Sequence, residues 1–299
     1  MQTSNRLVTQ LQAIFYSPSE KRFRAGWRVL LQLILLGLFV CIISFPVFWF
    51  SVGQSSTWIM GFFTLAGCFE ITVSVFYARR YIDKRSFVSL GISLKGLWIK
   101  DIAAGVGISF LMVGLMFAIG NVLNWIKIDG MAWTNDGIAN SFVQTTTWLV
   151  IFIMIAWQEE LLARGYQLQN ISEGLNIYWG AILSSILFSF FHLSNPGANW
   201  PSMLGVFLAG LMLSVGYIYT KQLWLPIGIH LGWNFFEGVL FGFPVSGMQT
   251  YALTKINLTG PELWIGGKFG PEAGLLLLPA LAFGVLLIFS YSKIRVKND

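Results

Sequence analysis

Charged residues are scarce in this chain of 299 residues, because aspartate, glutamate, lysine and arginine together make up only 11% of it. An ordinary soluble domain has about 25% charged residues. Hydrophobic residues make up 56% of the chain and fall into long unbroken runs. The chain therefore carries more apolar surface than a soluble fold can bury, which excludes a water-soluble enzyme and predicts a membrane protein.

Cysteine and histidine are also rare, with two of each. Cys41 and Cys68 lie inside apolar runs and give no disulfide framework. The sequence contains no internal repeat and no low-complexity segment. An inverted repeat is a common mark of secondary transporters, so its absence argues against that class.

Eight apolar stretches are long enough, or nearly so, to cross a bilayer as helices of ~20 residues. They are residues 27–50, 57–78, 102–125, 142–163, 177–194, 202–219, 223–242 and 272–291. The predicted fold class is therefore all-α, a polytopic membrane helix bundle of about eight transmembrane helices that forms a single membrane domain over residues 1–299. The longest outside connection, 243–271, is expected to be an ordered cap or a mobile flap.

Basic residues predict the orientation, because lysine and arginine in short loops stay on the cytoplasmic side of a membrane. All but three of the 19 lysines and arginines fall on one side of the predicted bundle; the exceptions are Lys127, Lys255 and Lys268. Both termini are thus predicted to be cytoplasmic. This distribution, together with anionic lipid, accounts for the net charge of +6 without a nucleic-acid partner.

Residues 1–26 are predicted to be a cytoplasmic interfacial segment. Between residues 5 and 16, Leu7, Leu11, Ile14 and Phe15 recur at helical spacing. This pattern suits a short helix that lies on the membrane surface.

Ionisable side chains inside predicted membrane helices are costly, so each one marks a candidate functional site. In the segment QEELLAR, Glu160 and Arg164 are four residues apart on one helix face, and we expect an ion pair. Glu159 points about 100° away around the helix and has no opposite charge at helical spacing. An unpaired carboxylate in an apolar site can act as a general base. Alternatively, both glutamates lie at a helix end in headgroup water.

Both histidines lie in predicted membrane helices. In HLGWN, His230 and Asn234 are four apart and face one side. They offer two hydrogen-bond donors that could hold an oxyanion, or two ligands for a metal. In FSFFH, Phe188 and His192 share a face, and we interpret Phe188 as packing that orients the imidazole. Each histidine could instead be a hydrogen-bonded core group.

Two further glutamates lie in apolar runs. Glu70 has no partner within its own helix, so it either forms a hydrogen bond to another helix or lies in a cavity. Glu237 follows Asn234 by three residues and is interpreted as a supporting or capping group rather than a catalyst.

The helix lengths predict that these polar residues lie at similar depths. The fourth and fifth helices are expected to meet near Gly174, because the amphipathic pattern continues past the fourth span and glycine commonly follows a helix end. Glu159 lies 15 residues before this turn and His192 lies 18 after it. At 1.5 Å rise per residue their heights differ by ~5 Å. For His230 to join them, the turn before its helix must lie roughly 10 Å closer to the bilayer middle.

Three motifs in this order on successive helices resemble the CAAX prenyl protease 2 family, which includes the bacterial CPBP proteins and the lysostaphin resistance protein A-like domain. The motifs are EExxxR at Glu159, Glu160 and Arg164, FxxxH at Phe188 and His192, and HxxxN at His230 and Asn234. The resemblance covers about residues 142–240, which we take as the catalytic core. Helices outside this core carry no motif of the family.

The resemblance implies an intramembrane endopeptidase whose site lies in a cavity open to the cytoplasm. Carried over by position, Glu159 and His192 would activate a water for attack on the scissile carbonyl. His230 and Asn234 would stabilise the resulting oxyanion. Structural support would come from the remaining motif residues, Glu160, Arg164 and Phe188.

The ligand set for a metal is thin, with no HExxH motif and no cysteine near the site. We therefore expect catalysis without a metal or other cofactor. A zinc ion would have Glu159, His192 and His230 as its ligands.

The expected partners are membrane lipids and a hydrophobic or lipidated peptide, which the family name implies to be of the prenylated CAAX type. We expect an integral protein of a bacterial or archaeal cytoplasmic membrane. Two other functions stay open. One is a non-catalytic protein of the same family, active in bacteriocin immunity or as a membrane regulator or scaffold, and the other is a transporter.

Overall fold

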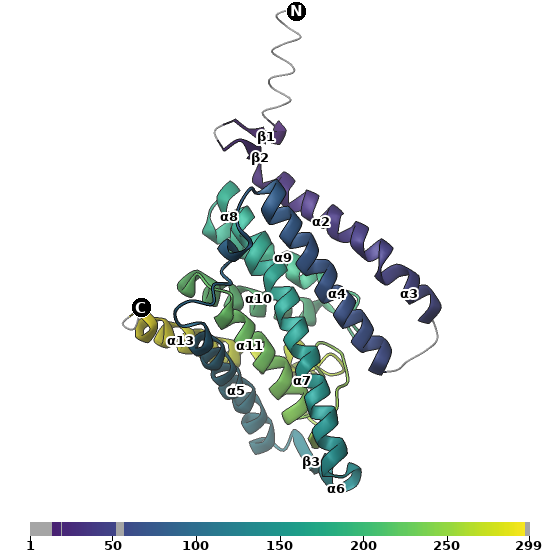
Figure 1. Ribbon diagram of the computed structural model, residues 1–299. Coiled ribbons are helices and arrows are strands. Elements are labelled where there is room, and N and C mark those ends of the chain that lie inside the picture. The colour runs from purple at the N-terminus through teal and green to yellow at the C-terminus, as the bar shows by residue number, and fades with distance from the viewer. Residues whose placement is uncertain (1–13, 19, 52–56, 297–299) are drawn as a thin grey trace, which may run out of the picture.

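The computed structural model describes residues 14–18, 20–51 and 57–296, and within them the protein is a bundle of helices (Figure 1). The longer helices are α2 (Ala25–Ile42), α3 (Ser44–Ser51), α4 (Thr57–Tyr77), α5 (Trp98–Val122), α7 (Ile138–Glu160), α9 (Ile177–Phe191), α10 (Trp200–Thr220), α11 (Trp224–Asn234) and α13 (Leu277–Val296). Shorter α-helices are α6 (Ala132–Asp136), α8 (Gln169–Gly174) and α12 (Glu262–Ile265). The π-helical segments are η1 (Ala78–Ile82), η3 (Leu161–Leu168) and η4 (Phe235–Leu240), and the 3-10 turns are η2 (Phe87–Leu90) and η5 (Pro271–Ala273).

Six helices in the described part of the chain are long and apolar enough to cross a membrane. They are Ala25–Ile42, Ile59–Ile82, Trp98–Val122, Ile138–Gly174, Trp200–Thr220 and Leu277–Val296. The structure does not show the predicted eight full spans, because the other two stretches form shorter helices. The fifth, 177–194, gives only the 15 residues of α9, and the seventh, 223–242, gives α11 and η4, which together fall short of a full span. The orientation of the termini stays a prediction.

The first predicted span, 27–50, is interrupted between α2 and α3. Pro46 lies four residues after Ile42, the last residue of α2. Proline has no N–H to donate to the carbonyl four residues earlier, and its ring crowds that carbonyl. The break is therefore a local consequence of the sequence, although the run of hydrophobic residues is continuous.

The fourth span is longer than its hydrophobic run predicts, because α7, η3 and α8 form one helix of 37 residues, Ile138–Gly174. It ends at Gly174, where the sequence pattern predicts a turn. Asn176 then caps α9, since its side chain accepts hydrogen bonds from the backbone N–H groups of Tyr178 and Trp179. The helical hairpin that carries two of the three motifs therefore turns between Gly174, which ends its first helix, and Asn176, which caps its second helix.

Helix α11 lies inside the bundle, and nearly all of its residues are buried. It approaches α5 closely, because Gly105 and Gly228 lie in their interface. A Cβ atom on Gly228 would lie 2.4 Å from the carbonyl oxygen of Ile102, and one on Gly105 would lie 2.5 Å from that of Leu225. Small residues allow such backbone contact between membrane helices. A helix enclosed by protein needs no full bilayer length, which explains why α11 is short.

Two small antiparallel sheets accompany the predicted helix bundle. Strand β1 (Tyr16–Ser17) pairs with β2 (Arg22–Phe23) near the start of α2, and β3 (Ile126–Met131) pairs with β4 (Thr254–Leu258) at the opposite end of the bundle (Figure 1). The second pairing makes the connection 243–271 an ordered cap rather than a flap. Of the predicted interfacial segment, residues 1–13 lie outside the described residues.

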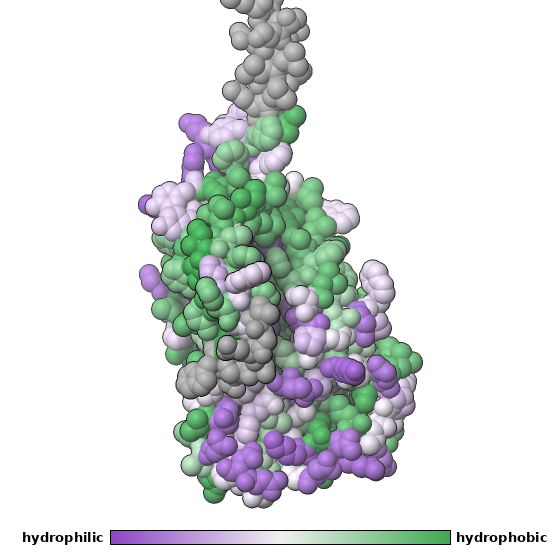
Figure 2. All heavy atoms as spheres, turned by 90° about the vertical axis from the view of Figure 1, so that its right-hand side faces the viewer, coloured by the Kyte–Doolittle hydropathy of each residue, from purple (hydrophilic) through white to green (hydrophobic). Residues whose placement is uncertain are grey.

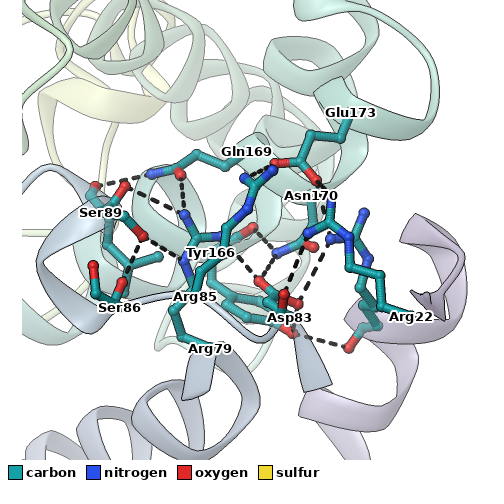
Figure 3. A network of polar contacts seen from close by, with 12 residues as sticks. Arg22, Arg79, Asp83, Arg85, Ser86, Ser89, Tyr166, Gln169, Asn170 and Glu173 are labelled. Carbon is teal, nitrogen blue, oxygen red and sulfur yellow. Dashed lines mark hydrogen bonds and ion pairs between the residues drawn. The ribbon is translucent and has the colours of Figure 1, made fainter. Parts of the chain in front are cut away.

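A polar network ties α2 to the helix that carries Glu159 (Figure 3). The Glu173 carboxylate, in α8, accepts hydrogen bonds of 3.0 Å from both Arg22 and Arg28 and also pairs with Arg85. Segments that the basic residues assign to the cytoplasmic side therefore meet at one end of the bundle.

Asp83 is the second acid of this network, and it is buried between α4 and the long helix. Its carboxylate accepts from Arg79 at 2.9 Å, from the Tyr166 hydroxyl at 3.1 Å and from the Asn170 amide at 3.1 Å. The end of the long helix is thus fixed to the loop after α4.

The face that carries α2, α3 and α4 is mostly hydrophobic, with hydrophilic atoms gathered at its two ends (Figure 2). Exposed apolar side chains continue along it from Leu30, Ile34 and Leu38 of α2 to Phe48 and Trp49 of α3. An apolar band between polar ends is the surface that a bilayer covers. Together with the six long apolar helices, it makes this chain an integral membrane protein.

Candidate active site

The buried end of α7 carries the first motif. Glu160 and Arg164 have no exposed surface and form the ion pair that their spacing predicts, with Arg164 Nη1 2.7 Å from Glu160 Oε1. Arg164 Nη2 also donates to the carbonyl oxygen of Gly210 in α10 at 2.9 Å. The pair therefore links the long helix to α10, and both charges are compensated inside the protein.

His230 of α11 joins this ion pair, which the motif spacing does not predict. Its Nδ1 lies 2.9 Å from Glu160 Oε1. Because a carboxylate only accepts, Nδ1 carries the proton of this bond. The ring also lies beside a second carboxylate, with Nε2 3.8 Å from Glu159 Oε2. Nε2 is therefore the ring nitrogen that faces Glu159 in the cavity.

His192 ends α9 and is held differently. Its Nδ1 lies 2.9 Å from the backbone carbonyl oxygen of Phe188, so in the neutral ring Nδ1 carries the proton and Nε2 is an acceptor. The rings of Phe188 and His192 pack with their centroids 4.8 Å apart. The Phe188 ring also lies 4.3 Å from the guanidinium carbon of Arg164. Phe188 thus orients His192 through both its backbone and its ring.

Glu159 lies between the two imidazoles. Its Oε2 atom is 3.8 Å from His192 Nε2 and 3.8 Å from His230 Nε2. Within the described residues this oxygen is buried without a hydrogen-bond partner. A separation of 3.8 Å is too long for a direct hydrogen bond, but one water can donate to both Glu159 and His192 across it.

The four residues predicted to be catalytic line one cavity of about 560 Å³. Asn234 lies on the same helix as His230, 5% exposed, and reaches the cavity with it. The Glu159 side chain is 25% exposed and is among the residues that line the cavity. The remaining walls are mostly apolar and come from α2, α4, α9, α10 and α11, with Leu36, Phe63, Phe191 and Met212 among them.

Comparison with known families decides the identity of this core. Residues 140–236 match the family described as type II CAAX prenyl endopeptidase Rce1-like. Over this stretch, about a third of the chain, the protein is similar to the Rce1-like family. The match contains all seven motif residues, and the family resemblance of the motifs is confirmed.

Other comparisons add little to the Rce1-like assignment. The chain is 28% identical over 117 residues to a protein of Methanocorpusculum labreanum described as "Putative manganese efflux pump MntP". This similarity covers 39% of the chain and 62% of that relative, so the chain spans less than two thirds of the curated protein it matches. No solved structure matches the chain.

The Rce1-like core does not offer a ready metal site. A carboxylate with two imidazoles is a ligand set that zinc accepts. However, no group of three or more histidine, cysteine, aspartate or glutamate side chains in the described part of the chain is placed to hold a metal ion. His230 directs Nδ1 to Glu160, so Nε2 is its nitrogen on the side of Glu159.

One acidic residue of the cavity escapes the sequence analysis. Glu272 lies in η5, outside the family match, and its carboxylate lines the same cavity. It is the first residue of the predicted span 272–291, where the hydrophobic run that follows conceals it. The sequence signal that could have identified Glu272 is an acidic residue at the edge of a predicted membrane span.

The other two glutamates, Glu70 and Glu237, are not among the residues that line the cavity. Glu70 accepts a hydrogen bond of 2.6 Å from the Ser44 hydroxyl of α3, which confirms the interhelical alternative. Glu237 is fully buried in η4, and neither carboxylate oxygen has a hydrogen-bond partner among the described residues. It is therefore no helix cap. Trp233, one turn earlier, donates its indole N–H to Glu272 instead.

Proposed function

We propose that this protein is an intramembrane endopeptidase that hydrolyses a peptide bond of a hydrophobic or lipidated substrate. The observation that carries the proposal is the position of Glu159 Oε2, 3.8 Å from each of two imidazoles that are held in different ways. A carboxylate and a neutral imidazole form a general base, and an imidazolium beside them is a donor for negative charge.

The first chemical step is the attack of water on the scissile carbonyl carbon. Water donates its two protons toward Glu159 Oε2 and His192 Nε2, so a lone pair of its oxygen points to the substrate. As the carbon–oxygen bond forms, one proton passes to this base pair. General base catalysis of this kind contributes about 10²–10⁴-fold to a rate.

The second step is stabilisation and collapse of the tetrahedral intermediate. His230 Nε2–H and the Asn234 side-chain amide supply donors for the oxyanion, worth about 10²–10³-fold for one such donor. Glu160 and Arg164 hold His230 in place. The carbon–nitrogen bond then breaks, and the leaving amine takes the proton held by Glu159 and His192.

The substrate class follows from the walls of the cavity and from where the cavity lies. Leu36 of α2 and Met60 and Phe63 of α4 contribute to its lining beside Phe191 of α9. These helices also face the apolar band of the surface (Figure 2). Such walls suit an apolar peptide segment or a lipid chain that arrives from the membrane. A prenylated CAAX substrate belongs to this class.

We further propose that the protein lies in the cytoplasmic membrane of a bacterium or an archaeon, with its site open to the cytoplasm. The concentration of basic residues at one end of the bundle supports this orientation. Anionic lipids are the natural partners of that end.

The proposal is tested with Glu159→Gln, which removes the carboxylate and keeps the shape of the side chain. Membranes from cells that express wild type, E159Q or the control E70Q are compared by quantitative terminal proteomics. Glu70 is a matched control, because it is another buried glutamate whose hydrogen bond to Ser44 lies outside the cavity. We expect new peptide termini with wild type and E70Q that are absent with E159Q. Identical termini for all three proteins would overturn the proposal.

The similarity to the protein described as a manganese efflux pump favours transport as a second candidate function. Against it, the described residues offer no cluster of three histidine, cysteine, aspartate or glutamate side chains for a manganese ion. Resistance to external manganese in cells that express the protein separates the two functions. A transporter predicts resistance that does not depend on cleavage, whereas an endopeptidase predicts none.

A further inference from the structure

Gln158 lines the cavity beside Glu159, and the proposed mechanism gives it no task. As the neighbour of Glu159 on α7, it points about 100° away around the helix, and it is among the residues that line the cavity. Its Oε1 atom is buried and has no hydrogen-bond partner in the described part of the chain. Its amide also carries N–H donors, and no hydrogen bond from them to another described residue is found. The cavity wall therefore holds an amide whose acceptor and donors are both unused.

The other polar side chains of the cavity, outside the proposed catalytic set, are engaged by the protein itself. The Thr64 hydroxyl donates to a backbone carbonyl one turn earlier in α4 at 2.9 Å. Asn195 donates its side-chain amide to the Ser246 carbonyl at 3.0 Å, and the Ser246 hydroxyl donates to the Glu272 carboxylate. Among the described lining residues, Gln158 is thus the one outside the catalytic set whose hydrogen-bonding groups stay available to a bound molecule.

The neighbouring wall of α4 makes room for this amide. Met60, Thr64 and Ile71 line the cavity, and Gly67 falls between them at helical spacing. A Cβ atom on Gly67 would lie 3.2 Å from Gln158 Oε1. The lack of a side chain at Gly67 therefore lets the amide lie against α4, with apolar side chains before and after it along the wall.

The substrate group that fits this amide is a peptide group. An apolar or lipidated segment brings few polar side chains into the cavity, but each of its residues other than proline brings one N–H and one carbonyl. Leaving such groups unpaired in apolar surroundings is costly. A glutamine amide carries an acceptor and donors side by side, so it complements both groups. Asn234 has the same groups, but the proposed mechanism uses them at the oxyanion.

We propose that Gln158 binds a main-chain peptide group of the substrate and so determines which bond reaches Glu159. The proposal rests on the proposed endopeptidase function and adds a substrate-positioning residue to it. Neighbouring Cα atoms of a helix are about 3.8 Å apart, and one extended residue spans about 3.3–3.6 Å. The peptide group that Gln158 binds therefore lies within about two residues of the scissile bond. Such a contact reads no side chain, so it serves lipidated and unlipidated segments alike.

The test uses the purified full chain and synthetic peptides in which single backbone amides are replaced by esters. One parent peptide is S-farnesylated and ends in Cys-Val-Ile-Met, a CAAX sequence; the other is the cleavage-site peptide found by terminal proteomics. Each ester removes one N–H and leaves every side chain unchanged, and the scissile bond stays an amide. The ratio of kcat/KM for the amide peptide to that for each ester peptide is measured, with E159Q as the blank.

We expect wild type to cleave the amide peptide about three- to tenfold faster than the peptide with an ester at one position near the scissile bond, because one hydrogen bond is lost. Gln158→Met keeps the length of the side chain and removes its amide, so the ratio at that position should fall to about one. Gln158→Ala is the second variant if the first does not fold. The matched control is Thr64→Val, on the same cavity wall, whose hydroxyl already has a partner, and it should keep the wild-type ratio.

The ratio also separates substrate contact from a structural role. A structural role of Gln158 lowers the rates for all peptides by one factor and leaves every ratio at its wild-type value, and this result would overturn the proposal. Ratios near one at every position in wild type would overturn it as well.

Absence of any cleavage beyond the E159Q blank would be a failure of the proposed function instead. Binding of the same peptides, fluorescently labelled, to E159Q and to Q158M/E159Q then decides the contact. Weaker binding of one ester peptide to E159Q, with no such difference in the double variant, supports the role of Gln158. Equal binding of all peptides to E159Q overturns it.

Discussion

The buried ion pair beneath the site gives the sharpest test of how the fold supports the chemistry. In Arg164→Met the Glu160 carboxylate stays buried and loses its 2.7 Å partner, while His230 is left as its only donor. Removing one partner of a buried pair costs ~3–5 kcal/mol. At roughly 2–4 °C per kcal/mol for a protein of about this size, the melting temperature in detergent should fall by about 6–20 °C.

The double variant E160Q/R164M separates charge from geometry. It removes both charges, and the amide oxygen of E160Q still accepts from His230 Nδ1. Replacing both members of a buried pair is often close to neutral, so the free energy of unfolding should recover to within ~1 kcal/mol of the wild-type value. Cleavage should nevertheless stay about 10²–10³-fold lower, because a neutral His230 no longer offers Nε2–H to the oxyanion.

Thermal unfolding is followed by scanning fluorimetry at one heating rate for all variants, and cleavage is measured on the substrate found by terminal proteomics. The reasoning is refuted if R164M melts at the wild-type temperature, or if the double variant is as unstable as the single one. Full activity in the double variant would show that His230 does not act as an imidazolium.

Three further results are expected. Gly228→Ala should destabilise the protein by about 1–3 kcal/mol and lower cleavage, because its Cβ would lie 2.4 Å from the Ile102 carbonyl oxygen. The control Gly107→Ala meets no atom within 4 Å and should melt at the wild-type temperature. Equal melting temperatures for the two variants would contradict the close packing of α5 and α11. Glu173→Gln should lower the free energy of unfolding by about 1–3 kcal/mol, since hydrogen bonds to charged groups are lost from three arginines. The exposed Glu20→Gln, which contacts Arg22 alone among its described ion pairs, should change that free energy by less than ~0.5 kcal/mol. Similar shifts of the melting temperature for both variants would show that the network is not stabilising. Prolonged incubation with a chelator should leave cleavage unchanged, and loss of cleavage that zinc restores would refute the metal-free mechanism.

The proposed site was partly readable from the sequence because helical spacing fixes which residues share a face. Glu160 and Arg164 meet as their separation of four predicts, and Phe188 packs on His192 for the same reason. The turn at Gly174 followed from a glycine after an amphipathic run. Six of the predicted spans are helices long and apolar enough for a bilayer, because a helix satisfies its backbone hydrogen bonds within the segment and so needs no water.

Two of the eight predicted stretches, 177–194 and 223–242, form helices shorter than a full span, and they show the limit of hydropathy. Apolar composition cannot distinguish a helix exposed to lipid from one enclosed by other helices. Helix α11 is enclosed, since Gly105 and Gly228 bring it against α5, and its length is set by protein neighbours rather than by the bilayer. The pairing of β3 with β4 joins segments more than a hundred residues apart, and no local pattern records it.

By itself, the sequence determined that the chain is an apolar helix bundle and that seven motif residues lie on three of its helices, because composition and spacing are local properties. Only the tertiary structure decided that His230 shares Glu160 with Arg164, that Glu159 lies between two imidazoles, and that Glu272 closes the same cavity. Contacts between distant segments depend on how the helices pack and how deeply each one sits. No periodicity within a single helix encodes those distances.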